Sequence, residues 1–315
     1  MSFLKPALLP IRLCDFPMQN ISELAADEEL MAILKTTALV ESRADRYAEY
    51  LHAVFRDRDG RWREAIEQWN AEERRHGELL RKLVVAADPG FDFDAAMHVY
   101  EAKVSYHACD GKSVRGSIAG ELVARCVVEA LASTFYRALN ESHATTNPSA
   151  ATAALAALAR DEARHYGMFV AMLREEQKSP NALGRWKRCW TGLRRMTELG
   201  DQQIIGAYVA VHAETINLEP KWMASRRYAA ALYPRYRTAH LLFASRLICP
   251  VLFGRSDSLT ITLFAIALRS GVWIKGVSAR TQLWVMSRWM SAASRAKSPA
   301  FESTGSRSPT ATPSM

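Results

Sequence analysis

The feature that most constrains this chain is a charged pattern that occurs twice, as EERRH at residues 72–76 and as DEARH at residues 161–165. In each copy a glutamate and a histidine lie one helical turn apart, and large apolar residues recur three and four positions away on both sides. These pairs are Glu73 with His76, and Glu162 with His165. A buried carboxylate is unfavourable unless it is paired or binds a metal ion. The two pairs therefore predict a metal site inside a helical protein.

Two other segments of helical pattern each place a single acid among apolar and small residues, at Glu41 and at Glu129. In a helical hairpin, residues equally distant from the turn lie side by side. The midpoint between Glu41 and the first pair's glutamate falls within the turn-like RDRDG, residues 56–60. The midpoint between Glu129 and the second pair's glutamate falls within SHATTNPS, residues 142–149. Each predicted hairpin therefore brings one lone glutamate level with one Glu-x-x-His pair.

One Glu from each of two helices and Glu-x-x-His from each of two others is the ligand pattern of di-metal carboxylate bundles. The predicted metal ligands are Glu41, Glu73, His76, Glu129, Glu162 and His165. A mixture of carboxylates and imidazoles suits two iron ions, with manganese as the alternative metal.

A second set of residues is expected just outside the ligands. Glu72 and Asp161 each precede a ligand glutamate by one position, about 100° around the helix, which turns them toward an adjoining helix. Because a metal-bound histidine usually donates its other N–H to a carboxylate, we predict that Asp161 accepts from His76 and Glu72 from His165. The arginines expected to neutralise these outer acids are Arg75 and Arg164.

The pattern of the whole chain predicts an all-α protein, and its few glycines and prolines agree with this class. Helices are expected over residues 21–57, 62–87, 94–108, 118–141 and 150–177. Further breaks are expected near Gly184, Gly200, Pro220, Pro250 and Gly254. The expected organisation is an N-terminal extension over 1–20, a four-helix bundle over 21–180, a basic and mostly helical region over 181–297, and a disordered Ser/Pro/Thr-rich tail over 298–315.

Cysteines and apolar runs favour a cytoplasmic protein. The five cysteines are odd in number and far apart, which indicates reduced thiols. The first residues do not have the pattern of a signal peptide. The longest apolar run, residues 258–268, stops at Arg269 and is shorter than the ~18 residues of a membrane span, so no such span is expected.

Charge is divided unevenly along the chain. Residues 181–315 hold 19 Lys+Arg and 6 Asp+Glu, a balance of +13, whereas residues 1–180 hold 22 and 27, a balance of −5. The basic region predicts an acidic partner, either a protein or anionic lipid. Residues 240–275 are amphipathic and basic, so peripheral membrane contact is one alternative. Nucleic acid is disfavoured because no binding motif accompanies the basic segments.

Two segments resemble the signatures of a known family, WNAEERRHGELL at residues 69–80 and DEARHY at residues 161–166. They are similar to those of the soluble acyl-carrier-protein desaturases, in the ferritin-like superfamily, and the resemblance covers about residues 30–175. It implies a ferritin-like bundle whose six predicted ligands hold a non-haem diiron centre. It also implies a dioxygen-dependent oxidoreductase of fatty acid metabolism, with electrons from a donor such as a ferredoxin. The implied substrate is an acyl chain on an acidic acyl carrier protein, and the implied assembly is a homodimer.

Some positions depart from that family. Ala132 stands where the family has a threonine, and the resemblance fades after about residue 180. Related arylamine N-oxygenases have an additional histidine ligand where this chain has Leu158, which argues against that group. The open alternatives are an iron-handling ferroxidase or store, another diiron mono-oxygenase acting on a small apolar substrate, and a non-enzymatic scaffold. Tyr136 is either a core residue or a neighbour of the site, and no catalytic residue beyond the ligands is identified.

Overall fold

The computed structural model describes residues 3, 21–143, 149–198, 202–213 and 221–297, with side chains described as far as residue 289. The predicted tail over 298–315 lies outside the described residues, as does the predicted extension over 1–20 except for Phe3. All regular elements in the described ranges are helices, which confirms the all-α class.

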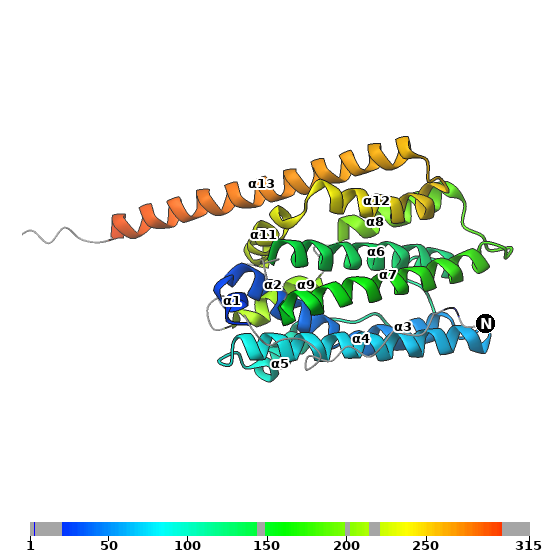
Figure 1. The fold of residues 1–315 in the computed structure, drawn as a ribbon, viewed down its shortest axis with the longest axis horizontal. Helices are drawn as coiled ribbons and strands as arrows, with labels where there is room; N and C mark the ends of the chain where they lie inside the picture. Colours follow the sequence, from blue (N-terminus) through cyan, green and yellow to red (C-terminus); the bar gives the residue numbers. More distant parts are fainter. Residues whose placement is uncertain (1–2, 4–20, 144–148, 199–201, 214–220, 298–315) are drawn as a thin grey trace, which may run out of the picture.

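The predicted bundle is present (Figure 1). Its helices are α1 (Ile21–Ala26), α2 (Glu28–Glu41), α3 (Ala44–Val54), α4 (Gly60–Ala87), α6 (Ile118–His143) and α7 (Ala150–Glu176), and α5 (Phe93–Lys103) follows α4. The two hairpins form as expected, because α2 and α3 pack along α4 while α6 packs along α7. Contacts between α4 and α7 join the hairpins.

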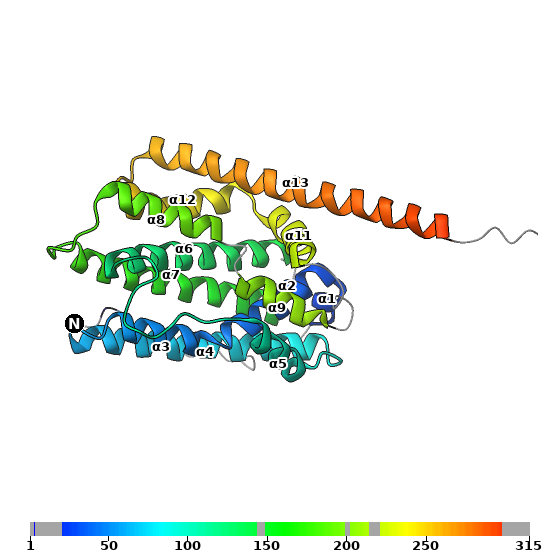
Figure 2. The same cartoon turned by 180° about the vertical axis from the view of Figure 1, so that it is seen from behind.

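Helices that follow the bundle cover part of it. They are α8 (Arg185–Thr197), α9 (Gln202–Val211), α11 (Lys221–Leu232), α12 (Thr238–Phe253) and α13 (Ser258–Lys297), with the short 3-10 helix η3 (Tyr233–Arg235) before α12. In Figure 2, as in Figure 1, α12 lies between the α6–α7 hairpin and α13. The α9 and α11 helices pack against α2, at one end of the bundle.

Two apolar clusters form the core of the bundle. One contains Leu34, Leu80 and Leu155, and the other contains Ile66 and Phe169. Along α4 and α7, four of the predicted ligands, Glu73, His76, Glu162 and His165, occupy the short stretch between these clusters. The bundle therefore holds a polar layer between two apolar layers.

The single long helix expected over residues 21–57 is wrong, because the chain forms three helices there. The Asp27 side chain accepts a hydrogen bond from the Leu30 N–H and starts α2. The second break, between α2 and α3, follows Glu41, where the Ser42 hydroxyl donates to the Ala38 carbonyl at 2.7 Å. Such local hydrogen bonds compete with continued helix.

One other expectation is corrected in the C-terminal region. Pro250 does not end α12, which continues to Phe253 and stops at Gly254, whose φ is +64°. Buried Val251 and Leu252 hold that last turn against the core.

The expectation that no segment approaches a membrane span is also corrected. Ser258–Trp289 is long and apolar enough to cross a membrane by length and composition, because it contains an 18-residue window with a mean hydropathy of 1.3. An uninterrupted apolar run is too strict a criterion for a span, because a helix can carry isolated basic residues between its apolar turns. Only 11% of that window is buried.

The break after α2 depends on a glycine of α4. A Cβ built on Gly77 would lie 2.8 Å from both Cα and the amide nitrogen of Ser42. Gly77→Ala is therefore expected to lower the free energy of unfolding by about 1–3 kcal/mol, because backbone cannot move aside cheaply. Denaturant unfolding of the purified variant measures this difference.

Gly167 in α7 provides the matched control. It is exposed, and a Cβ built there meets no atom within 4 Å. Gly167→Ala is expected to raise the free energy of unfolding by about 0.5–1 kcal/mol, because alanine loses less backbone entropy in a helix. Equal effects of the two substitutions would show that the close contact at Gly77 does not exist.

Candidate metal centre

The structure brings the six predicted ligands together. One group consists of Glu73, Glu129, Glu162 and His165, and a second consists of Glu41, Glu73 and His76. Within each group one ligand atom per residue lies within 4.8 Å of the others. All six residues are buried except Glu41, which is partly exposed and borders a cavity. Each group could hold a metal ion, and Glu73 belongs to both groups.

The histidine Nδ1 atoms point into this cluster. His76 Nδ1 lies 3.2 Å from Glu162 Oε1, and His165 Nδ1 lies 3.1 Å from Glu73 Oε1. Among the described residues, both Nδ1 atoms and Glu162 Oε1 are buried without a hydrogen-bond partner. Unpaired buried polar atoms are rare in proteins and each calls for an explanation. A metal ion between these atoms would supply the missing partner, so the residues fit a metal centre.

The opposite nitrogens of both histidine rings face the predicted outer acids. His76 Nε2 lies 3.3 Å from Asp161 Oδ2, and His165 Nε2 lies 2.9 Å from Glu72 Oε2. Both predicted contacts are therefore present. A carboxylate at Nε2 favours the tautomer that carries its proton there, which leaves Nδ1 free to bind a metal.

The predicted arginines contact these acids unequally. Arg164 on α7 donates a hydrogen bond to Glu72 on α4. Its Nη2 also lies 3.2 Å from Asp161 Oδ1. Arg75 is more exposed and lies 3.7 Å from Glu72 Oε1. Arg164 therefore joins the two outer acids, whereas Arg75 adds a weaker, more solvated charge.

The contact of Asp161 with His76 leads to a test. Asp161→Ala is expected to weaken iron binding by about 10- to 100-fold, because His76 loses the acceptor that orients its ring. Asp161→Asn is expected to recover part of this loss, since an amide oxygen still accepts from Nε2–H. Glu78→Ala, which removes an exposed acid of α4, is the matched control. Anaerobic titration with Fe(II) measures the affinities, and equal affinity in all three variants would refute the positioning role.

The carboxyl groups of the cluster differ in their pKa values. Burial raises the pKa of every one of them. For Glu73 and Glu162 the adjacent histidines outweigh burial, so both pKa values are lowered. For Glu41, burial and the charge of Glu73 raise the pKa well above its usual value. Burial and the neighbouring carboxylates also raise the pKa of Glu129 well above its usual value, although the charge of Arg125 lowers it in part.

The pKa values of the two histidines predict pH-dependent metal binding. Burial lowers the pKa of His76 and His165, but the surrounding carboxylates outweigh it and raise both well above the usual value. Raised pKa values mean that protons compete with the metal up to higher pH. Affinity for Fe(II) is therefore expected to rise with pH, by about tenfold or more per unit between about pH 5.5 and 7.5. Calorimetry in buffers of different ionisation enthalpy measures the released protons, and pH-independent binding without proton release would contradict this expectation.

A cavity of about 310 Å³ adjoins the cluster. Glu41, Glu73, Glu129 and Glu162 border it, and α2, α6, α9 and α11 supply most of its other residues. Those residues are largely apolar or aromatic and include Val40, Leu131, Ala132, Phe135, Ile204, Tyr228 and Leu232. Its size lies at the lower end of the range of small-molecule pockets, about 300–1,000 Å³. An apolar group in this cavity would lie beside the carboxylates.

The structure decides the position of Tyr136, which the sequence left open. Its hydroxyl donates to Glu41 Oε1 at 2.7 Å, so Tyr136 contacts a predicted ligand as well as the core. It also lines the cavity. Burial and the charge of Glu41 raise the pKa of Tyr136 well above its usual value, so its hydroxyl keeps its proton.

Arg125 is a neighbour of the cluster that the sequence analysis missed. Its side chain is buried and donates to Glu129 one turn further along α6. Its guanidinium carbon lies 4.7, 4.9 and 5.2 Å from the ring centres of Tyr47, Trp69 and Phe169. The spacing of four residues between Arg125 and Glu129 was the available signal.

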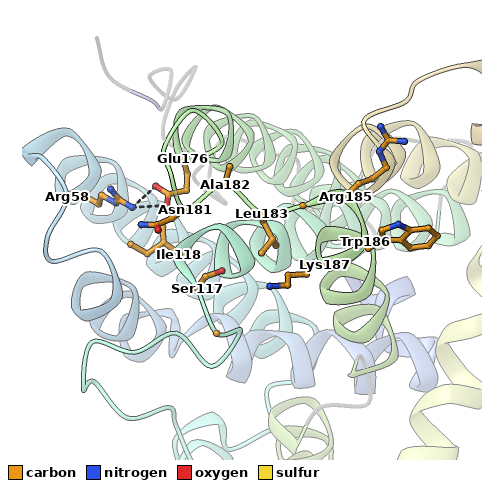
Figure 3. A pocket seen from close by; sticks show the side chains of 12 residues that line it. Arg58, Ser117, Ile118, Glu176, Asn181, Ala182, Leu183, Arg185, Trp186 and Lys187 are labelled. Carbon is orange, nitrogen blue, oxygen red and sulfur yellow. Dashed lines mark hydrogen bonds and ion pairs between the residues drawn. The ribbon is translucent and has the colours of Figure 1, made fainter.

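A second cavity, of about 680 Å³, lies where the segment before α8 meets α6 and α7 (Figure 3). Arg58 and Glu176 border it and form an ion pair at 2.6 Å. In the described part of the chain, none of the six predicted ligands lines this cavity. It is therefore separate from the candidate metal centre.

In comparisons with known proteins, no protein-family model and no curated protein matches this sequence. The function of the site must therefore be inferred from its residues and their geometry.

Proposed function

We propose that this chain is a non-haem diiron oxidoreductase that uses dioxygen. The observation that carries the proposal is that buried histidine Nδ1 atoms and carboxylates meet in one cluster. Three polar atoms of this cluster have no hydrogen-bond partner among the described residues. In an ordinary ion-pair network these atoms would be oriented for hydrogen bonds to one another, whereas His76 Nδ1 and Glu162 Oε1 lie 3.2 Å apart without one. A metal centre explains why they face a common space instead.

The charge of the donor set supports two divalent ions. Four carboxylates from Glu41, Glu73, Glu129 and Glu162 balance the charge of two divalent metals, so a neutral centre can be buried between apolar layers. Nitrogen and oxygen donors without thiolate suit iron, and manganese is the alternative.

The chemistry would be divided between the metals and the protein. When bound, two iron ions would supply the two-electron activation of dioxygen that oxidises an unactivated C–H bond. The protein holds both histidine rings through Glu72 and Asp161 and keeps water from the cluster through the apolar layers above and below. The adjoining cavity would place an apolar chain beside the carboxylates.

The resemblance and the cavity favour an acyl chain as the substrate, with desaturation as the reaction and an external donor such as a ferredoxin. The basic balance of residues 181–315 would suit an acidic acyl carrier protein. Oxygenation of the chain, or of a smaller apolar molecule, is the second outcome that a product analysis must distinguish.

The first test is the iron content of the full-length protein after anaerobic reconstitution, with optical spectra before and after reduction and exposure to air. About two irons per chain and a spectrum that changes with oxygen are expected. No bound iron would refute the proposal.

Acyl-carrier-protein substrates are then incubated with ferredoxin, its reductase and dioxygen, and products are analysed by mass spectrometry. Loss of two hydrogens indicates desaturation, addition of one oxygen indicates oxygenation, and oxidation of iron alone indicates an iron-handling protein.

A further inference from the structure

The outer face of α13 is a large apolar surface without a partner in the described part of the chain. The helix lies outside α11 and α12 and packs on them through one side only (Figures 1 and 2). On that side Ala265 and Ala279 are buried, and Gly276 approaches Tyr233 closely. Eight large apolar residues on the outward side between residues 259 and 285 are 44% to 69% exposed: Leu259, Leu263, Ile266, Trp273, Ile274, Val277, Trp284 and Val285.

These exposed residues form one stripe. They recur at intervals of one, three, four or seven positions from Leu259 to Val285, which keeps them on a single face of the helix. The buried positions Ala265, Gly276 and Ala279 occupy the opposite face. A soluble surface rarely exposes a contiguous apolar area of this kind unless it binds a partner.

The charges around the stripe indicate the partner. Residues 258–297 contain no aspartate or glutamate, and their exposed basic residues are Arg269, Lys275, Arg280 and Arg288. Two tryptophans, Trp273 and Trp284, are 66% and 57% exposed on the stripe. A polar face rich in Lys and Arg beside Trp and aliphatic residues is the composition of a helix that lies in a membrane interface. A second copy of this chain would instead bring like charges together around the stripe.

A lying orientation fits the structure better than a spanning one. In a spanning helix Arg269, Lys275 and Arg280 would lie within the hydrocarbon layer, where charged side chains are unfavourable. The inner face of α13 is packed on α11 and α12, so lipid cannot surround the helix while this packing remains.

We propose that the stripe of α13, residues 259–285, docks this protein onto an anionic bilayer, with the helix parallel to the membrane plane. The apolar side chains enter the boundary between headgroups and acyl chains, and the basic side chains meet anionic headgroups. This inference does not depend on the metal centre.

The test measures binding of the full-length protein to sedimentable vesicles of phosphatidylcholine alone or with 30% phosphatidylglycerol. At least tenfold tighter binding to the anionic vesicles is expected, with weaker binding at high salt. Trp273→Glu with Trp284→Glu is expected to reduce binding at least tenfold. Ala71→Glu with Ala95→Glu, at exposed positions of α4 and α5, adds the same charge elsewhere and is expected to cause only a small loss.

Three outcomes would overturn the proposal. The first is equal or absent binding to both kinds of vesicle, and the second is equal loss in the two double variants. The third is a stable dimer that the tryptophan variant dissociates, because the stripe would then bind a second copy. Circular dichroism of each variant excludes unfolding as the cause of lost binding, and the exposed positions make a folded variant the expected result.

Discussion

Glu73→Gln is expected to reduce bound iron from about two ions to less than one per chain, and to lower oxidative turnover by at least about 100-fold. Glu73 is the residue that the two candidate ligand groups share. An amide is neutral and donates where a carboxylate accepts, so both metal positions lose a negative ligand. Elemental analysis after anaerobic reconstitution measures the iron, and single-turnover oxidation of the reduced protein measures the activity.

Two matched variants sharpen this prediction. Glu41 belongs to one group only, so Glu41→Gln is expected to leave about one iron bound. Glu176 is a buried acid outside the cluster that pairs with Arg58, so Glu176→Gln is expected to retain the full iron content. If Glu73→Gln binds as much iron as Glu176→Gln, the assignment of Glu73 as a shared ligand is wrong.

Arg125→Met is expected to have the largest effect on the stability of the metal-free protein, lowering the free energy of unfolding by about 3–5 kcal/mol. Arg125 and Glu129 form a buried pair, and removal of the arginine leaves the carboxyl without its partner. The guanidinium also loses its contacts with three aromatic rings. Denaturant unfolding of the apo protein at neutral pH measures the change.

A double variant separates charge from packing. Arg125→Met combined with Glu129→Gln is expected to recover much of the lost stability, because no uncompensated charge is then buried. Arg61→Met breaks the exposed pair with Glu175 and is expected to cost only about 0–1 kcal/mol. If the double variant is as unstable as Arg125→Met, the loss comes from packing and the charge explanation fails.

Local periodicity carried much of the information about the candidate site. Helical spacing alone placed Glu73 and His76 on one apolar face, because side chains three and four positions apart project to the same side. Hairpin symmetry then placed the lone Glu41 level with them. The structure brings these residues together, and the outer contact of His76 with Asp161 is also present. The placement of Glu73, His76 and Glu41 depended only on residues within one helix or one hairpin, whereas the contact of His76 with Asp161 also required the ligand pattern that joins the two hairpins.

The sequence could not predict features that depend on how separate helices approach one another. The break at Ser42 involves its close contact with Gly77 on another helix, and the hydroxyl of Tyr136 reaches Glu41 only because α6 packs near the end of α2. Burial of Arg125 likewise requires three aromatic rings from other turns and helices.

The sequence by itself determined the helical class, the two hairpins and the residues that meet at their centre, because these follow from periodicity and turn position. Only the tertiary structure decided which faces are covered. The apolar turns of α13 are as hydrophobic in sequence as those of a core helix, yet the fold packs one side of them and leaves Trp273 and Trp284 exposed. A hydrophobic side chain favours leaving water. Packing between distant segments decides whether protein or another apolar phase then surrounds it.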